Sequence, residues 1–100
     1  MLGKYESMII LAPNLSAEEV DAEETKIVDL VGELGGELVK TDNWGKKQLA
    51  YEIMKFREGT YIINYFNLNT QKISLIERHY RLNEKIIRHN IIKLEAEEQE

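Results

Sequence analysis

The stretch TYIINYFNL, residues 60–68, constrains the fold of this chain more than any other segment. It is rich in β-branched and aromatic residues, which favour an extended strand. Alternate residues of a strand point to opposite faces of a sheet, and here both sets are apolar. The sets are Ile62, Phe66 and Leu68 on one side and Tyr61, Ile63 and Tyr65 on the other. We expect the first set to pack beneath helices and the second to form an exposed patch that binds a protein partner. The reverse assignment is the alternative, because both sets are apolar.

A helix is predicted over residues 17–34. Ser16 and Glu19 form a capping box, in which the side chain of each residue bonds the backbone amide of the other. Apolar residues then recur with helical spacing until Gly35 and Gly36, which favour the left-handed backbone of a helix exit. The acidic residues of the first turns complement the positive end of the helix dipole.

A second helix is predicted to start at Thr70, as its cap, and to run to about Leu82. Apolar residues between Ile73 and Tyr80 recur at i, i+3 and i+7, so they share one face. Asn83 tolerates a left-handed backbone and is expected to end this helix.

One long strand is expected between residues 38 and 53. Residues 42–45 interrupt its pattern, either as a bend or bulge within one long strand or as a turn between two; we favour one long strand and leave bulge or turn at Trp44 open. Glu58 and Gly59 are expected to turn the chain into the strand at 60–68.

Residues 4–11 and 86–94 supply the first and last strands, so the element order is β-α-β-β-α-β. This order predicts an α+β, ferredoxin-like domain over residues 1–94, in which a four-stranded antiparallel sheet carries two helices on one face. No further element is left to cover the other face of the sheet. Residues 95–100 are acidic and poor in apolar side chains, and we expect this tail to be disordered.

Charge is distributed unevenly along the chain, whose formal net charge is -5. Residues 1–39 hold 2 basic and 9 acidic residues, whereas residues 40–94 hold 11 basic and 5 acidic ones. A polyanion responds to the local field, within a Debye length of about 8–10 Å. The acidic total therefore does not exclude a nucleic-acid partner.

Catalytic and metal chemistry is poorly supported. The chain has no cysteine, and neither His79 nor His89 has a serine or carboxylate at a telling spacing. An acylphosphatase-like enzyme has the same topology and needs an arginine in its first loop, but no arginine precedes Arg57. We therefore expect no enzyme activity, no cofactor, no metal and no small-molecule substrate. The apolar runs are too short for a signal peptide or a membrane span, so we expect neither export nor a membrane location.

Lys46 and Lys47 follow Gly45 directly and start the second half of the long strand. They form a basic corner that suits phosphate groups, and Lys4, Arg88 and Lys93 join it if the sheet folds as expected. Spacing alone equally allows scattered, solvated lysines.

Five segments together resemble one known family. They are KYE at 4–6, PNL at 13–15, WGKKQLAYEI at 44–53, EGTYIINYF at 58–66 and LNEKIIRHNIIK at 82–93. In this order they are similar to the bacterial small-subunit ribosomal protein S6 family. The G-x-K-x-L-A-Y-x-I core between Gly45 and Ile53 is the most specific part of the resemblance.

The resemblance implies a cytoplasmic, ribosome-associated structural protein. It further implies that the protein binds the central domain of small-subunit ribosomal RNA beside ribosomal protein S18. The implied RNA contacts are Lys47 and Arg88, with Lys4, Lys46 and Lys93 as flanking candidates. The same resemblance makes Tyr51 a structural support for its loop.

A second hypothesis belongs to another class of protein. A ferredoxin-like interaction or regulatory domain would use Tyr61, Ile63 and Tyr65 to form a homodimer. A homodimer that does not associate with ribosomes would favour this hypothesis.

Overall fold

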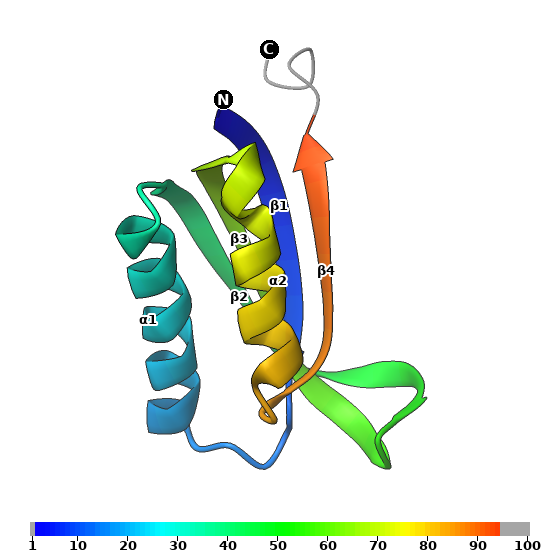
Figure 1. The fold of residues 1–100 in the computed structure, drawn as a ribbon. Helices are drawn as coiled ribbons and strands as arrows, with labels where there is room; N and C mark the ends of the chain where they lie inside the picture. The colour runs from blue at the N-terminus through cyan, green and yellow to red at the C-terminus, as the bar shows by residue number, and fades with distance from the viewer. Residues whose placement is uncertain (1, 95–100) are drawn as a thin grey trace.

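The computed structural model describes residues 2–94, which form an antiparallel sheet with two helices packed on one face (Figure 1). The elements are β1 (Leu2–Leu11), α1 (Ala17–Glu33), β2 (Glu37–Ile53), β3 (Phe56–Asn69), the 3-10 turn η1 (Thr70–Lys72), α2 (Ile73–Leu82) and β4 (Ile86–Leu94). The four strands lie in the order β2-β3-β1-β4, and each neighbouring pair is antiparallel. The predicted α+β, ferredoxin-like class is confirmed. The predicted tail, residues 95–100, lies outside the described residues.

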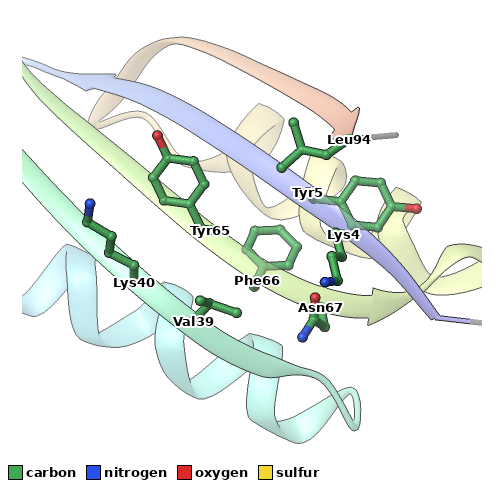
Figure 2. Close-up of a pocket in the computed structure, with 8 residues that line it drawn as sticks. All are labelled: Lys4, Tyr5, Val39, Lys40, Tyr65, Phe66, Asn67 and Leu94. Atoms are coloured by element: carbon green, nitrogen blue, oxygen red, sulfur yellow. The ribbon is translucent and has the colours of Figure 1, made fainter. Parts of the chain in front are cut away.

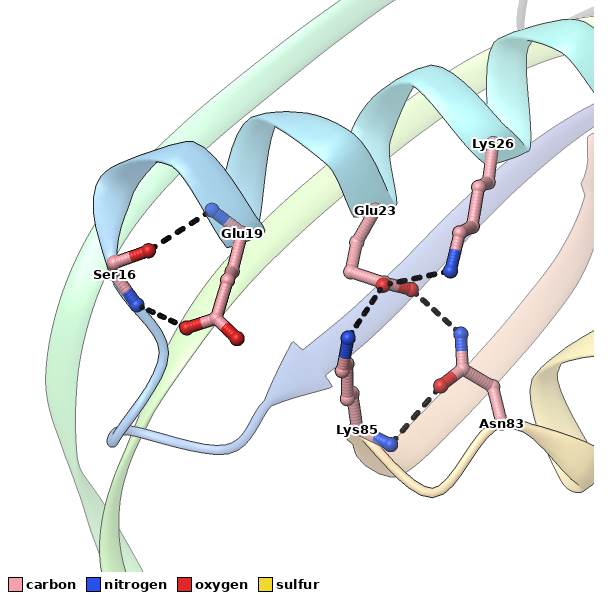
Figure 3. A network of polar contacts seen from close by, with 6 residues as sticks. All are labelled: Ser16, Glu19, Glu23, Lys26, Asn83 and Lys85. Carbon is pink, nitrogen blue, oxygen red and sulfur yellow. Dashed lines mark hydrogen bonds and ion pairs between the residues drawn. The ribbon is translucent and has the colours of Figure 1, made fainter.

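The start of α1 agrees with the predicted capping box (Figure 3). The Ser16 backbone amide donates to Glu19 Oε1 at 2.9 Å, and the Glu19 amide donates to Ser16 Oγ at 3.1 Å. Two otherwise free amides are thereby satisfied at the helix end. The helix ends just before Gly35, whose φ of 82° is readily adopted only without a side chain.

The entry and exit of α2 differ from the prediction. Asn69, not Thr70, supplies the capping side chain, because its Oδ1 accepts a bond from the Gln71 amide and the chain then makes one 3-10 turn. The predicted left-handed exit at Asn83 is also wrong, since its φ is -91°. Asn83 acts through its side chain instead. Its Oδ1 accepts a hydrogen bond from the Lys85 amide, and this bond tightens the turn into β4.

The main core lies between the sheet and the helices. The predicted set Ile62, Phe66 and Leu68 is almost fully buried there, which confirms the assignment of the two faces of β3. Ile27 and Ile76 bring the two helices onto this layer. The helices thus cover one face of the sheet completely.

A buried carboxylate joins α1 to the turn before β4 (Figure 3). Glu23 is 1% exposed and accepts a hydrogen bond from Asn83 Nδ2 at 2.6 Å. The ammonium groups of Lys26 and Lys85 lie 3.1 and 3.6 Å from Glu23 Oε2. Burial alone would raise the pKa of Glu23, but the Asn83 bond and the two lysines outweigh it and hold its pKa below the usual 4.5. The carboxylate is therefore a charged clamp inside the fold.

The second strand is continuous, as favoured from the sequence. Its register with β3 skips Val39 and Trp44, so each adds one unpaired residue to β2, as a bulge does. The following turn lies at Met54 and Lys55, whose φ values are 51° and 71°, and not at the predicted residues 58–59. Two consecutive positive φ values give the twist that a two-residue hairpin requires.

The β2–β3 ladder continues past the end of the sheet as a hairpin arm, residues 46–58, which projects near the start of β4 (Figure 1). Its side chains cover one end of the face opposite the helices. This hairpin cluster consists of Ile10, Ala12 and Ile87, packed by Leu49, Ile53, Phe56 and Tyr61. The expectation of a face without cover is therefore wrong for this end of the sheet. Neither helix of residues 2–94 is long and apolar enough to span a membrane.

Candidate nucleic-acid interface

We call the face of the sheet opposite the helices the open face. The strand register arranges its residues in four rows. Each row takes one residue from β2, β3, β1 and β4 in turn. The rows are Glu37, Asn67, Lys4 and Leu94; Lys40, Tyr65, Glu6 and Ile92; Asp42, Ile63, Met8 and Asn90; and Gly45, Tyr61, Ile10 and Arg88. Three cations and three acids alternate over this surface. The open face is thus neutral overall and mixed in charge.

Three of the predicted basic residues lie at the hairpin end of the sheet. Lys46 and Lys47 stand opposite Thr60 and Gly59, at the base of the hairpin arm, and both are exposed. Arg88 occupies the outer position of the row nearest the arm and is exposed as well. Within residues 2–94 none of the three makes an ion pair with an acid. Their charges are therefore available to a polyanion.

Tyr51 on the hairpin arm holds the side chain of Arg88. Its hydroxyl accepts a hydrogen bond from Arg88 Nη1, and the guanidinium carbon lies 5.6 Å from the centre of the Tyr51 ring. A guanidinium held over an aromatic ring loses less freedom when it later binds a phosphate. This contact ties the hairpin arm to β4, whereas the predicted support of its own loop by Tyr51 stays a prediction.

Lys4 and Lys93 lie away from this corner. Lys4 is six residues from Ile10 along β1, which places it about 20 Å from the row of Arg88. Lys93 pairs with Tyr5, whose side chain is buried on the helix side of the sheet. The expected cluster of five cations is wrong, because β4 runs the length of the sheet and carries its two basic residues to opposite ends.

The predicted partner patch is on the open face, but its residues differ in exposure. Tyr61 packs against the hairpin cluster, and Ile63 is only 4% exposed. Tyr65 is partly exposed, and the ammonium of Lys40 lies 5.9 Å from the centre of its ring. The accessible part of the patch is therefore centred on Tyr65.

The two histidines are held by packing against the core. The rings of Tyr80 and His89 have centroids 5.6 Å apart, and those of Tyr80 and His79 are 6.2 Å apart. The Tyr80 hydroxyl is itself buried against Ser7 Oγ, and burial raises the pKa of Tyr80 to about 12. Both rings are thus fixed beside Tyr80, and His79 Nε2 is buried there without a hydrogen-bond partner within residues 2–94.

Residues 4–93 match the family model described as Ribosomal protein S6. The chain belongs to this family. It is 41% identical over 100 residues to small ribosomal subunit protein bS6 of Synechocystis sp., covering 100% of this chain and 88% of that protein. It is 37% identical over 93 residues to bS6 of Carboxydothermus hydrogenoformans, covering 93% and 97% respectively. The crystal structure of 30S ribosomal protein S6 from Thermotoga maritima superposes with a TM-score of 0.92 at 33% identity, covering 99% of this chain and 94% of that one.

Membership of the S6 family confirms the resemblance drawn from the sequence. Proteins of this family are components of the cytoplasmic small ribosomal subunit, and their role is structural. The exposed side chains of Lys46, Lys47 and Arg88 in this S6-family chain agree with that role.

Two features of this S6-family chain were missed from the sequence. Lys40 reaches the open face beside Tyr65 because β2 bulges at Val39 and shifts the alternation of its side chains. Arg57 on the hairpin arm is neutralised by Glu52, with 3.2 Å between Nε and Oε2. Such contacts depend on how two strands are paired. The residue pattern of a single strand does not show that pairing.

Proposed function

We propose that this S6-family chain is a structural constituent of the small ribosomal subunit that binds the central domain of its RNA together with ribosomal protein S18. The observation that carries the proposal is the match to the S6 family over residues 4–93. The mixed charge of the open face and the separate group of cations at the hairpin end support a protein that binds two different partners.

The RNA-binding group in this proposal is Lys46, Lys47 and Arg88. These side chains are exposed and form no ion pair with an acid within residues 2–94, so they can replace counterions on phosphates. The acids of α1 lie on the helix side of the sheet, to which Lys46 points, whereas Lys47 and Arg88 lie on the open face. Three cations give weak binding alone, and the partner protein supplies further basic surface.

The protein partner in this proposal docks on the open face around Tyr61, Ile63 and Tyr65. An aromatic and aliphatic surface with alternating charges is typical of a protein interface. A phosphate backbone would meet Glu6 and Asp42 on the same face. The proposal therefore assigns RNA to the hairpin end and protein to the open face.

The test is the affinity for a central-domain fragment of small-subunit RNA, measured by filter binding with and without S18. Log affinity falls by about 0.9 per decade of salt for each phosphate that a cation neutralises. Three cations therefore predict a fall of about 3 per decade. Lys47→Glu should weaken binding to all RNA sequences alike and reduce that fall by about 1. Arg81→Glu, on the helix side, is the matched control.

An unchanged RNA affinity of Lys47→Glu would contradict the assignment of the hairpin end. The alternative of a homodimeric interaction domain makes a different prediction for the wild-type chain. It requires a dimer at micromolar concentration that does not sediment with small ribosomal subunits.

A further inference from the structure

The exposed aromatic rings of the sheet differ in what already contacts them. The ring of Tyr51 lies against the guanidinium of Arg88. Tyr65 lines a pocket of about 290 Å³ at the end of the open face away from the hairpin arm, and Lys40 lies beside its ring (Figure 2). Trp44 is 55% exposed, and its ring has no aromatic or cationic partner within residues 2–94. Trp44 therefore presents a free aromatic surface.

The bulge in β2 holds Trp44 at the edge of the sheet. Trp44 is the extra residue of this bulge, and β2 is an outer strand. The next residue, Gly45, has a φ of 78°, and its amide donates to Asn43 Oδ1 at 2.8 Å. A Cβ at Gly45 would meet nothing within 4 Å, so the space beside this glycine is open. Trp44 belongs to neither hydrophobic cluster, so its backbone is fixed while its side chain stays unburied.

Two cations follow Trp44 along the strand. Lys46 and Lys47 are two and three residues away, which corresponds to about 7 and 10 Å. Both side chains are exposed, and neither makes an ion pair within residues 2–94. They point to opposite faces of the sheet, so positive charge flanks this edge. A phosphate next to the Trp44 ring would therefore meet a cation.

The acids near Trp44 lie on its other side along the chain. Asp42 precedes Trp44, and the Lys40 ammonium lies 3.5 Å from Asp42 Oδ2. Glu24 of α1 contacts the side chain of Asn43. An anionic ligand is therefore expected to extend from the Trp44 ring toward the lysines and away from these two carboxylates.

A single aromatic ring among polar and cationic residues suits a nucleotide better than a protein. The core of a protein interface is poor in lysine, whereas Trp44 is followed by Gly45, Lys46, Lys47 and Gln48. Sites for single-stranded nucleic acid combine cations, which bind phosphates, with aromatic rings on which bases stack. A base within a double helix is stacked on its neighbours, so a base that stacks on a side chain has to be unpaired.

We propose that Trp44 stacks on an unpaired base of the RNA, with Lys46 and Lys47 as contacts of the adjoining phosphates. This proposal rests on the proposed function, in which the hairpin end of the sheet binds ribosomal RNA. It adds an aromatic contact to the three cations. It also names the kind of RNA that this surface takes, which is a single-stranded segment such as a loop or a bulge.

The fluorescence of Trp44 reports this contact directly, because the chain has one tryptophan. The full-length chain is titrated at low salt with the central-domain fragment, with a single-stranded RNA oligonucleotide and with the same oligonucleotide annealed to its complement. The fragment and the single strand should quench the fluorescence, and the duplex should leave it nearly unchanged at equal occupancy. Filter binding measures the occupancy. Bound fragment without quenching, or equal quenching by the duplex, would overturn the proposal.

Substitutions of Trp44 separate stacking from charge. Trp44→Ala should weaken the affinity for the fragment about tenfold. The loss should be the same at every salt concentration, because Trp44 releases no counterions, whereas Lys47→Glu changes the salt dependence. Trp44→Phe keeps an aromatic ring and should retain most of the affinity, whereas Trp44→Leu should lose it. Equal affinities of these two variants would contradict stacking.

The matched control is Leu75→Ala, which removes a 44% exposed apolar side chain from α2 and should bind RNA as the wild type does. Because Trp44 is packed in neither cluster, urea denaturation should show little loss of stability in any Trp44 variant. A loss of RNA affinity that accompanied unfolding would contradict a contact made by an exposed ring.

The outcomes separate this inference from the proposed function. If the wild-type chain does not bind the fragment, with or without S18, the proposed function is wrong. If it binds the fragment and Trp44→Ala binds equally well, only the stacking contact is wrong. If Trp44→Ala keeps its affinity for RNA and loses affinity for S18, measured by calorimetry without RNA, Trp44 belongs to the protein interface and the proposal is overturned.

Discussion

The apolar side chains on the two faces of the sheet are covered in different ways. The helix face is covered by both helices, and some of its buried polar groups are paired inside the chain, as Ser7 is with Tyr80 and the Asn64 Oδ1 with Thr41. The open face is covered at one end only, by the hairpin arm, and a pocket of about 290 Å³ lies open at its other end. The difference agrees with the proposal that a protein docks on the open face, while the helix face provides stability.

Phe66 and Tyr65 test this division most strongly, because they are neighbours in β3 on opposite faces. Phe66 is 1% exposed in the main core, and Phe66→Ala should lower the free energy of unfolding by about 3–5 kcal/mol through lost burial and a cavity. Tyr65→Ala should cost about 1 kcal/mol or less, and weaken binding of the partner instead. Urea denaturation measures both, and equal losses of stability would contradict the division.

Gly59 tests whether the hairpin cluster is as tightly packed as the main core. A Cβ at this position would collide with Ile10 Cγ2 and lie 3.2 Å from the Leu11 carbonyl oxygen. Gly59→Ala should therefore destabilise the chain by about 1–3 kcal/mol.

Gly32→Ala is the matched control for this substitution. A Cβ at Gly32 in α1 meets nothing within 4 Å, so the change should stabilise the chain by up to about 1 kcal/mol through helix propensity. Thermal melting of both variants measures the contrast. If Gly59→Ala left the stability unchanged, the hairpin arm would be able to shift and make room for the added methyl group, and the cluster would not be tightly packed.

Glu23 makes the stability of the helix face depend on pH. Because its folded pKa lies below 4.5, the stabilisation is fully present above the ordinary carboxyl pKa and is lost as pH falls through the lowered value. Glu23→Gln should cost about 1–2 kcal/mol at pH 7 and remove this part of the acid sensitivity. Urea midpoints between pH 7 and pH 3 measure it, with exposed Glu33→Gln as the control. If the urea midpoints of the wild type and of Glu23→Gln fell in parallel with pH, Glu23 would not contribute to the acid sensitivity, and the prediction would be wrong.

Tyr51→Phe should have the smallest effect. It removes the hydroxyl that accepts a bond from Arg88 but keeps the ring beneath the guanidinium. Because both side chains are exposed, stability should change by about 0.5 kcal/mol or less, while affinity for RNA falls about two- to threefold. Tyr65→Phe on the open face is the control. A larger loss from the control would move the RNA surface away from the hairpin end.

Much of the fold follows from local patterns in the chain. The capping box at Ser16, the faces of β3 and the bounds of β4 depend on short-range spacing, and all three were predicted. The hairpin turn was misplaced because Met54 and Lys55 are not typical turn residues, while Gly59 serves close packing against Ile10. Local patterns do not contain such long-range contacts.

The candidate site was predicted only in part for the same reason. Lys46 and Lys47 are adjacent in the chain, so their proximity required no register. The separation of Lys4 from Arg88 depends on how β1 and β4 align, and the approach of Lys40 to Tyr65 depends on the bulge at Val39. The clamp at Glu23 joins residues 60 positions apart, and from the sequence the acids of the first helical turns were assigned only to the helix dipole.

The two bulges in β2 also affect how copies of this chain meet one another. An outer strand of 17 residues is a template on which an identical strand can pair, and repeated pairing of this kind builds fibrils. The extra residues at Val39 and Trp44 break the regular spacing of free backbone groups along this strand, and Lys46 and Lys47 repel a second copy. Both features disfavour edge-to-edge pairing of two copies through β2.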